Sequence, residues 1–183
     1  FILGLAYLNL ASSYSERDTN FMYALNLVEK ANEYIKFLKE EGPKSWLEAK
    51  YADQKGWLLF KLAKLGIVNF DTQEAIACLR NAICMRAHSL FYLHLALSLE
   101  YNIEILCKKP KKTDDDNAQI QRIIDQAFAC CDHIVELDTD LQGRPTEKAK
   151  ELRLRLNDLR ESQQKTTEAT DKKSDADNQP IYA

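Results

Sequence analysis

Residues 92–101, YLHLALSLEY, repeat the pattern of residues 7–14, YLNLASSY: Tyr, Leu, a polar residue, Leu and Ala stand at the same spacing. A second apolar pattern, with residues three or four positions apart, occurs in three segments: Ala24, Val28 and Ala31; Ala75, Leu79 and Ala82; Ala127, Cys131 and Ile134. The two patterns alternate along the chain. Such alternation indicates a repeated pair of helices.

Small residues recur inside both patterns. Ala11, Gly56 and Ala96 belong to the first helix of each pair, and Ala24, Ala75 and Ala127 belong to the second. Small side chains at a crossing let two helix backbones approach closely. A single hairpin cannot bury both of its faces, whereas stacked hairpins share a continuous core. The predicted fold is therefore all-α: a right-handed α-solenoid of about three antiparallel helical hairpins and a C-terminal capping helix.

Helix start signals set the expected boundaries. Ser45 with Glu48 and Asp71 with Glu74 match the capping-box pattern, and a third start is expected at Asp116 or Asn117. The predicted helices are 2–15, 20–40, 46–64, 72–86, 89–107, 117–137 and 146–163. They group into repeats of about 3–40, 46–87 and 89–139.

The C-terminal part divides into a helix and a tail. Residues 146–163 carry one apolar stripe, of Ala149, Leu152, Leu156 and Leu159, on an otherwise charged helix. We expect this helix to cover the last hairpin, with a solvated tether as the alternative. The domain then spans residues 1–163, and the polar stretch 164–183 is expected to be disordered.

Composition excludes several classes of protein. The net charge is −3 with both signs mixed, and no basic stripe of the kind that binds nucleic acid is present. The sequence contains no run of 18 apolar residues, so it predicts no membrane span. Five cysteines without a CxxC pair favour a reducing compartment such as the cytoplasm over a disulfide framework. Phe1 is interpreted as a fragment boundary, with an omitted initiator Met as the alternative.

The segments GWLLFKLAKL (56–65) and EAIACLRNAICMRA (74–87) resemble the tetratricopeptide repeat, and HIVELDTD (133–140) resembles the end of its second helix. The chain departs from that repeat in three respects, the first being that Tyr7, Ala52 and Tyr92 stand where its Trp is expected. Ala87 and Thr139 stand where the closing Pro is expected, and the connections within the pairs have unequal lengths. An unclassified array of α-hairpins is therefore the alternative.

This resemblance implies a concave groove lined by the first helix of each pair. The residues expected to face it are Leu8, Ser12, Asp53, Trp57, Phe60, Leu93, Leu97 and Tyr101. The family's carboxylate clamp for chaperone tails needs Lys, Asn and Arg in the groove. The corresponding positions hold Leu8, Ser12, Gln54, Leu90 and His94. A chaperone C-terminal acidic tail is therefore not expected as the partner.

The predicted function is a non-catalytic scaffold that binds a segment of another protein or a peptide in this groove. No catalytic motif, cofactor fingerprint or metal-ligand spacing occurs, and His94 is interpreted as a core or groove residue. Two alternatives stay open. The groove is covered and forms part of the core, or the chain is a regulatory or assembly segment of a larger enzyme whose catalytic domain lies outside it.

Overall fold

The computed structural model describes residues 1–17, 20–67, 70–138 and 144–177, with side chains as far as residue 164. The described residues form helices and connecting loops, with no strands among them, which confirms the all-α prediction. The helices are α1 (Ile2–Glu16), α2 (Phe21–Ile35), α3 (Glu41–Lys64), α4 (Thr72–Met85), α5 (Ser89–Cys107), α6 (Asp114–Leu137) and α7 (Arg144–Asp177).

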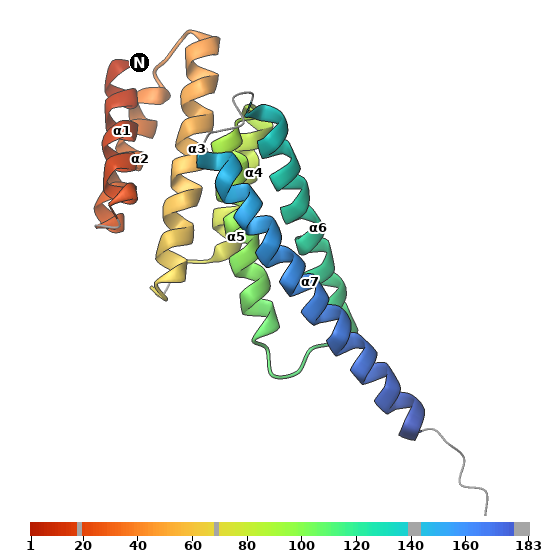
Figure 1. Ribbon diagram of the computed structural model, residues 1–183. Coiled ribbons are helices and arrows are strands. Elements are labelled where there is room, and N and C mark those ends of the chain that lie inside the picture. The colour runs from red at the N-terminus through yellow and green to blue at the C-terminus, as the bar shows by residue number, and fades with distance from the viewer. Residues whose placement is uncertain (18–19, 68–69, 139–143, 178–183) are drawn as a thin grey trace, which may run out of the picture.

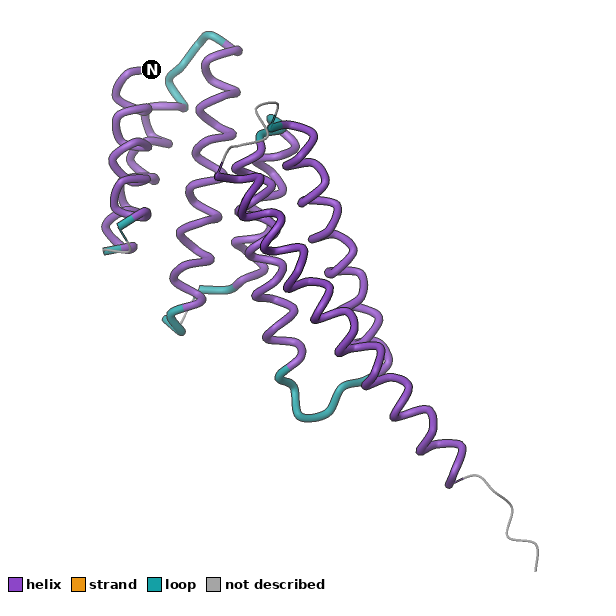
Figure 2. Tube along the Cα trace, viewed as in Figure 1, coloured by secondary structure: helices purple, strands orange, loops and turns teal. Residues whose placement is uncertain are grey.

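The helices are arranged as successive hairpins. α1 pairs with α2, α3 with α4 and α5 with α6, and each hairpin contacts the next through α2 with α3 and α4 with α5. The odd-numbered helices also contact one another in order, α1 with α3, α3 with α5 and α5 with α7. Figure 1 shows α1 and α2 at one end and α7 lying along α5 and α6 at the other. The loops that join the helices are drawn in Figure 2.

Small residues lie at the crossings inside the hairpins, as predicted. Ala11, Ala24, Ala75, Ala96 and Ala127 are all fully buried. The closest approach is at Gly56 in α3. A Cβ atom there would lie 2.7 Å from Leu79 Cγ and 2.9 Å from the Ala75 carbonyl oxygen of α4. A larger residue at this position would therefore force α3 and α4 apart.

The core is divided between the two ends of the array. One cluster joins α1 and α2 to α3, and includes Leu8, Val28 and Leu58. The other joins α4 to α7, and includes Leu79, Leu99 and Ile124. The residues of the predicted second-helix pattern are all fully buried, which confirms that assignment.

Two predicted helix starts are wrong by about one turn, and one is confirmed. α3 begins at Glu41 rather than at the Ser45 signal, because Pro43 is compatible with the first turn of a helix. Asp71 caps α4 as predicted, and its Oδ1 accepts a hydrogen bond of 3.0 Å from the Gln73 amide.

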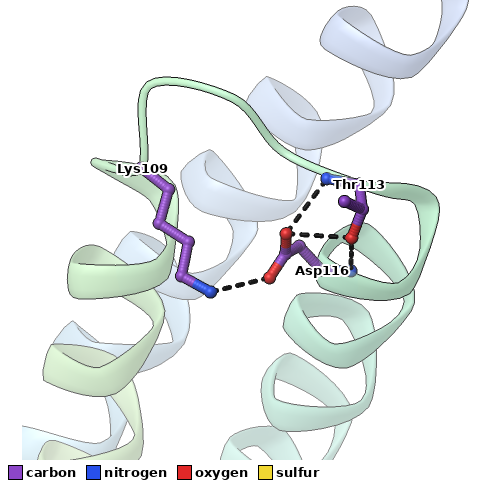
Figure 3. A network of polar contacts seen from close by, with 3 residues as sticks. All are labelled: Lys109, Thr113 and Asp116. Carbon is purple, nitrogen blue, oxygen red and sulfur yellow. Dashed lines mark hydrogen bonds and ion pairs between the residues drawn. The ribbon is translucent and has the colours of Figure 1, made fainter.

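The third start lies at Thr113 instead of Asp116 or Asn117. Thr113 Oγ1 accepts from the Asp116 amide at 3.1 Å, and Asp116 Oδ2 accepts from the Thr113 amide at 3.0 Å. Lys109 Nζ lies 2.8 Å from Asp116 Oδ1 (Figure 3). Hydrogen bonds from Lys109 and Thr113 lower the pKa of Asp116 to about 2. The reciprocal capping box therefore uses Thr113 as the cap and Asp116 as its third residue.

α7 covers the last hairpin. The side chains of Ala149, Leu152 and Leu156 are fully buried, so the residues form a docked helix and not a solvated tether. Arg155 of α7 binds Glu100 of α5 through two contacts, Nε to Oε1 at 2.5 Å and Nη2 to Oε2 at 3.0 Å.

The helix also continues beyond the predicted end, to Asp177, where disorder was expected from residue 164. This stretch contains no Gly or Pro before Pro180, so no residue type that breaks a helix interrupts it. Residues 178–183 of the predicted tail lie outside the described residues.

α5 is the most apolar of the long helices. By length and composition it is the one described helix that could cross a membrane, and 50% of its apolar stretch is buried inside the fold. Its position explains its composition, because it contacts α3 and α4 of the preceding hairpin, α6 of its own hairpin, and α7. An apolar helix buried on several sides is typical of the interior of a folded protein.

Candidate partner-binding cleft

A cleft of about 740 Å³ lies between the first helices of the three hairpins. Its walls come from the C-terminal half of α1, most of α3, the first two turns of α5 and the start of α7. A smaller hollow of about 120 Å³ lies between α3 and α5 and shares Trp57 and Lys61 with the cleft. The two hollows thus adjoin along the helices predicted to line a groove.

Seven of the eight predicted groove residues line one of these hollows. Ser12, Asp53, Trp57 and Leu93 line the cleft, and Phe60, Leu97 and Tyr101 line the smaller hollow beside Trp57. That any of them binds a partner stays a prediction.

The eighth residue is wrongly placed. Leu8 is fully buried in the core between α1, α2 and α3. It shares the buried side of α1 with Gly4, Ala11 and Ser15, but unlike Ala11 and Ser15 it does not line the cleft.

Aromatic rings form a continuous ladder along the site. The Trp57 ring stacks on His94 with centroids 4.2 Å apart and planes 12° apart. Phe60 follows at 5.1 Å from Trp57, and Tyr101 meets Phe60 edge-on at 5.8 Å. Trp57 keeps part of its surface exposed, so the ladder offers an apolar contact to a molecule in the cleft.

A buried carboxylate orients the histidine. Asp53 Oδ1 lies 2.8 Å from His94 Nδ1, and Asp53 is 2% exposed. An ionised carboxylate can only accept, so Nδ1 carries the proton that joins the pair. The ring is then held by a hydrogen bond at its edge and by Trp57 on its face, which leaves Nε2 as the second polar atom of the imidazole.

The cleft carries more cationic than acidic side chains. Lys50, Lys61, Arg144 and Lys148 line it, against Glu16 and Asp53. Lys50 Nζ donates to Asn9 Oδ1 at 2.7 Å and lies 5.3 Å from the centre of the Trp46 ring. Burial lowers the pKa of the Lys50 ammonium, while the nearby Asp53 carboxylate opposes that shift.

Two buried polar atoms in the cleft wall have no hydrogen-bond partner among the described residues. They are Ser15 Oγ in α1 and Gln54 Oε1 in α3. A buried polar group without a partner costs about 1–3 kcal/mol. Most buried polar side-chain atoms in proteins have a hydrogen-bond partner, so each of these two atoms calls for an explanation.

Ser98 lies one helical turn after His94 on α5. The nearby Ser98 hydroxyl donates to the His94 backbone carbonyl at 2.9 Å, so this hydroxyl is bonded away from the imidazole. The described residues contain no cluster of His, Cys, Asp or Glu that could hold a metal ion. The cleft thus combines apolar surface, an oriented imidazole and cationic side chains.

The cysteines lie apart from this cleft. Cys130 and Cys131 are buried, and burial raises the pKa of Cys130 to about 12 and that of Cys131 to about 11. This agrees with the prediction of small apolar residues for these two, whereas Cys84 is exposed.

Sequence reasoning placed Gln54, Leu90 and His94 at groove positions, and all three line the cleft. It missed the cations at its rim. Arg144 and Lys148 come from the start of α7, and only the path of that helix brings them to α1 and α3. The position of these two residues in the cleft therefore depends on tertiary packing and has no local sequence pattern.

No family model matches this chain, and no curated protein and no solved structure matches it either. The resemblance to the tetratricopeptide repeat consequently depends on the residues quoted from the sequence alone.

Proposed function

We propose that this protein is a non-catalytic interaction scaffold that binds a segment of another protein in the cleft between α1, α3 and α5. In this proposal the hairpins form a right-handed α-solenoid of the tetratricopeptide type. The alternation of hairpins and the contacts among odd-numbered helices support that geometry. A cytoplasmic location, or another reducing compartment, belongs to the same proposal, because the cysteines are free.

One observation carries the binding proposal. The partly exposed Trp57 stands in a cleft of about 740 Å³, stacked on an imidazole that a buried carboxylate holds in place. Aromatic residues in desolvated surroundings are the usual anchors of protein interfaces. The volume suits one or a few side chains of a bound segment, since ligand sites commonly measure about 300–1,000 Å³.

The partner we propose is a peptide segment with an apolar anchor residue and polar neighbours. The apolar anchor packs on Trp57, and the polar neighbours of the anchor reach the unpaired oxygens of Ser15 and Gln54. A chaperone carboxylate tail remains excluded in this proposal, because Ser12, Gln54 and His94 stand at clamp positions that require lysine, arginine or asparagine.

The test begins with capture of partners by crosslinking mass spectrometry and continues with the segment so identified as a synthetic peptide. Trp46 and Trp57 are the two tryptophans of the chain, and both line the cleft. In a Trp46→Phe variant the emission of Trp57 reports directly on occupancy of the cleft. Addition of the peptide is expected to shift that emission and to reduce its quenching by acrylamide.

The decisive variant is Trp57→Ala. It is expected to weaken peptide binding by about 1–3 kcal/mol, as truncation of an interface anchor does, with little change in melting temperature. Leu154→Ala is the matched control, because Leu154 is exposed on α7 and does not line the cleft. A large fall in melting temperature with binding reduced only in proportion would identify Trp57 as a core residue and would refute the proposal.

A further inference from the structure

Exposed apolar side chains are concentrated on the first hairpin. Of the sixteen large hydrophobic residues that are exposed among the described residues, eight lie within residues 1–37. The other eight are distributed over the remaining helices and loops. Scattered single residues need no explanation, but a contiguous group on one hairpin does.

Most of this group forms one surface, which we call the outer face. Residues three or four positions apart share one side of a helix, and the two helices contribute one such stripe each. The outer face consists of Leu3, Tyr7, Leu10 and Tyr14 from α1 and Tyr23, Tyr34 and Phe37 from and just beyond α2. Tyr7 stacks on Tyr34 with centroids 5.6 Å apart, and Tyr14 meets Tyr23 edge-on at 5.1 Å, so the stripes lie side by side.

The outer face points away from the rest of the array. On the opposite side of the hairpin, Asn9 of α1 accepts from Lys50 at 2.7 Å and Glu29 of α2 binds Lys55 at 2.9 Å, both in α3. α1 and α2 contact no helix beyond α3 among those described. Figure 1 accordingly shows this hairpin at one end of the described helices.

The repeat itself indicates what this face is suited to contact. Leu10 aligns with Lys55 in α3 and with Leu95 in α5, each directly before the small residue of the crossing. Lys55 contacts Glu29 of the preceding α2, and Leu95 shares a core cluster with Ile76 and Leu79 of the preceding α4. At Lys55 this position thus contacts the second helix of the preceding hairpin, and at Leu95 it lies in a core to which that helix contributes. Leu95 is 6% exposed, whereas Leu10 is 45% exposed.

We propose that the outer face packs against the same face of a second copy of this chain, related by a two-fold axis. In that dimer α2 of one copy lies on α1 of the other, where a preceding second helix would lie, and the contact is reciprocal. Leu27 of this α2 stripe is buried in the core, and of the exposed positions 23, 30, 34 and 37 Lys30 alone is charged, so the face does not repel itself strongly.

The available area is adequate for such a contact. Phe37 is 83% exposed, and Leu3, Leu10, Tyr23 and Tyr34 are each 39–56% exposed. With ordinary side-chain areas these five residues expose on the order of 500 Å², which lies within the roughly 300–600 Å² of the largest apolar patch on a typical monomer, a patch that is often functional. Ile2 and the partly exposed Tyr7 and Tyr14 adjoin them, which brings the surface toward the ~800 Å² that each partner contributes to a standard interface.

Sedimentation velocity of the chain from about 1 to about 200 µM tests this proposal. We expect a concentration-dependent rise to twice the chain mass of 21.1 kDa. Leu10→Glu changes both copies of the interface at once, so it is expected to raise the dimer dissociation constant by at least ~100-fold. Leu10 is exposed, and the helical circular dichroism and melting temperature of the variant should therefore stay close to those of the parent.

Leu154→Glu is the matched control, because Leu154 is 67% exposed on α7 at the opposite end of the array. It should dimerise like the parent chain. A chain that remains monomeric throughout the range overturns the proposal. So does a dimer that Leu10→Glu leaves intact or that Leu154→Glu disrupts to the same extent.

Discussion

The contact between α3 and α4 at Gly56 permits a sharp prediction, for the change Gly56→Ala. In a helix interior this change normally stabilises a protein by about 1 kcal/mol, because glycine loses more backbone entropy on folding. Here the added Cβ would lie 2.9 Å from the Ala75 carbonyl oxygen and 2.7 Å from Leu79 Cγ. The side chain of Leu79 can rotate, but the carbonyl belongs to the backbone of α4.

The two helices must therefore separate, and packing along their whole crossing is weakened. Overpacking of this kind costs about 1–3 kcal/mol or more, so we expect a net loss of about 1–3 kcal/mol after the gain in helix propensity. For a chain of this length the melting temperature should fall by roughly 3–10 °C. Urea and thermal unfolding followed by helical circular dichroism measure both quantities.

Gly4→Ala is the matched control for this experiment. Gly4 also lies in a helix and is buried, but a Cβ there would have its nearest contact at 3.4 Å, from Ile35 Cγ1, which is ordinary packing distance. This variant should be as stable as the parent chain or up to about 1 kcal/mol more stable. If Gly56→Ala matched Gly4→Ala in stability, the inference of a backbone-limited crossing would be refuted.

Two further predictions concern the C-terminal half. At about pH 8 a thiol reagent should modify the exposed Cys84 first and Cys130 and Cys131 last. The raised pKa values of Cys130 and Cys131 keep these two thiols protonated and therefore unreactive. Equal rates of modification in the folded chain would contradict their buried environment. Arg155→Ala should loosen α7, because it removes the bidentate partner of the nearly buried Glu100. We expect the free energy of unfolding to fall by about 1–3 kcal/mol and proteases to cut α7 earlier, whereas Arg155→Lys should restore only part of that stability. An unchanged α7 would show that the apolar stripe alone holds this helix.

The fold was predictable from the sequence where the signals are local. Small residues and apolar spacing lie within single helices, and Ala24, Ala75 and Ala127 are buried as that spacing predicts. Helix starts were less predictable, because two capping signals lay within a few residues of each other. Thr113 and Asp116 can each cap a helix, and in the structure both belong to the same capping box, with Thr113 as the cap.

The candidate cleft could be predicted only in part, because a helix face is assigned by its neighbours. Leu8 and Ser12 are one turn apart on α1, yet Leu8 packs into the core and Ser12 lines the cleft. Likewise Leu10 carries the apolar pattern of a buried position, but no described helix covers it. The cationic residues of α7 could not be assigned to the cleft from the sequence, because no local pattern indicates which hairpin that helix crosses.

The division of the core into two large and two small clusters also implies an order in which parts of the molecule unfold. α1 and α2 are held to the rest through α3 alone, whereas α5 is enclosed by α4, α6 and α7. In arrays whose units touch only their neighbours, opening begins at the least supported unit and spreads from there. Amide hydrogens should therefore exchange fastest in the first hairpin and slowest in α5 and α6, so that different parts of this chain have different free energies of opening.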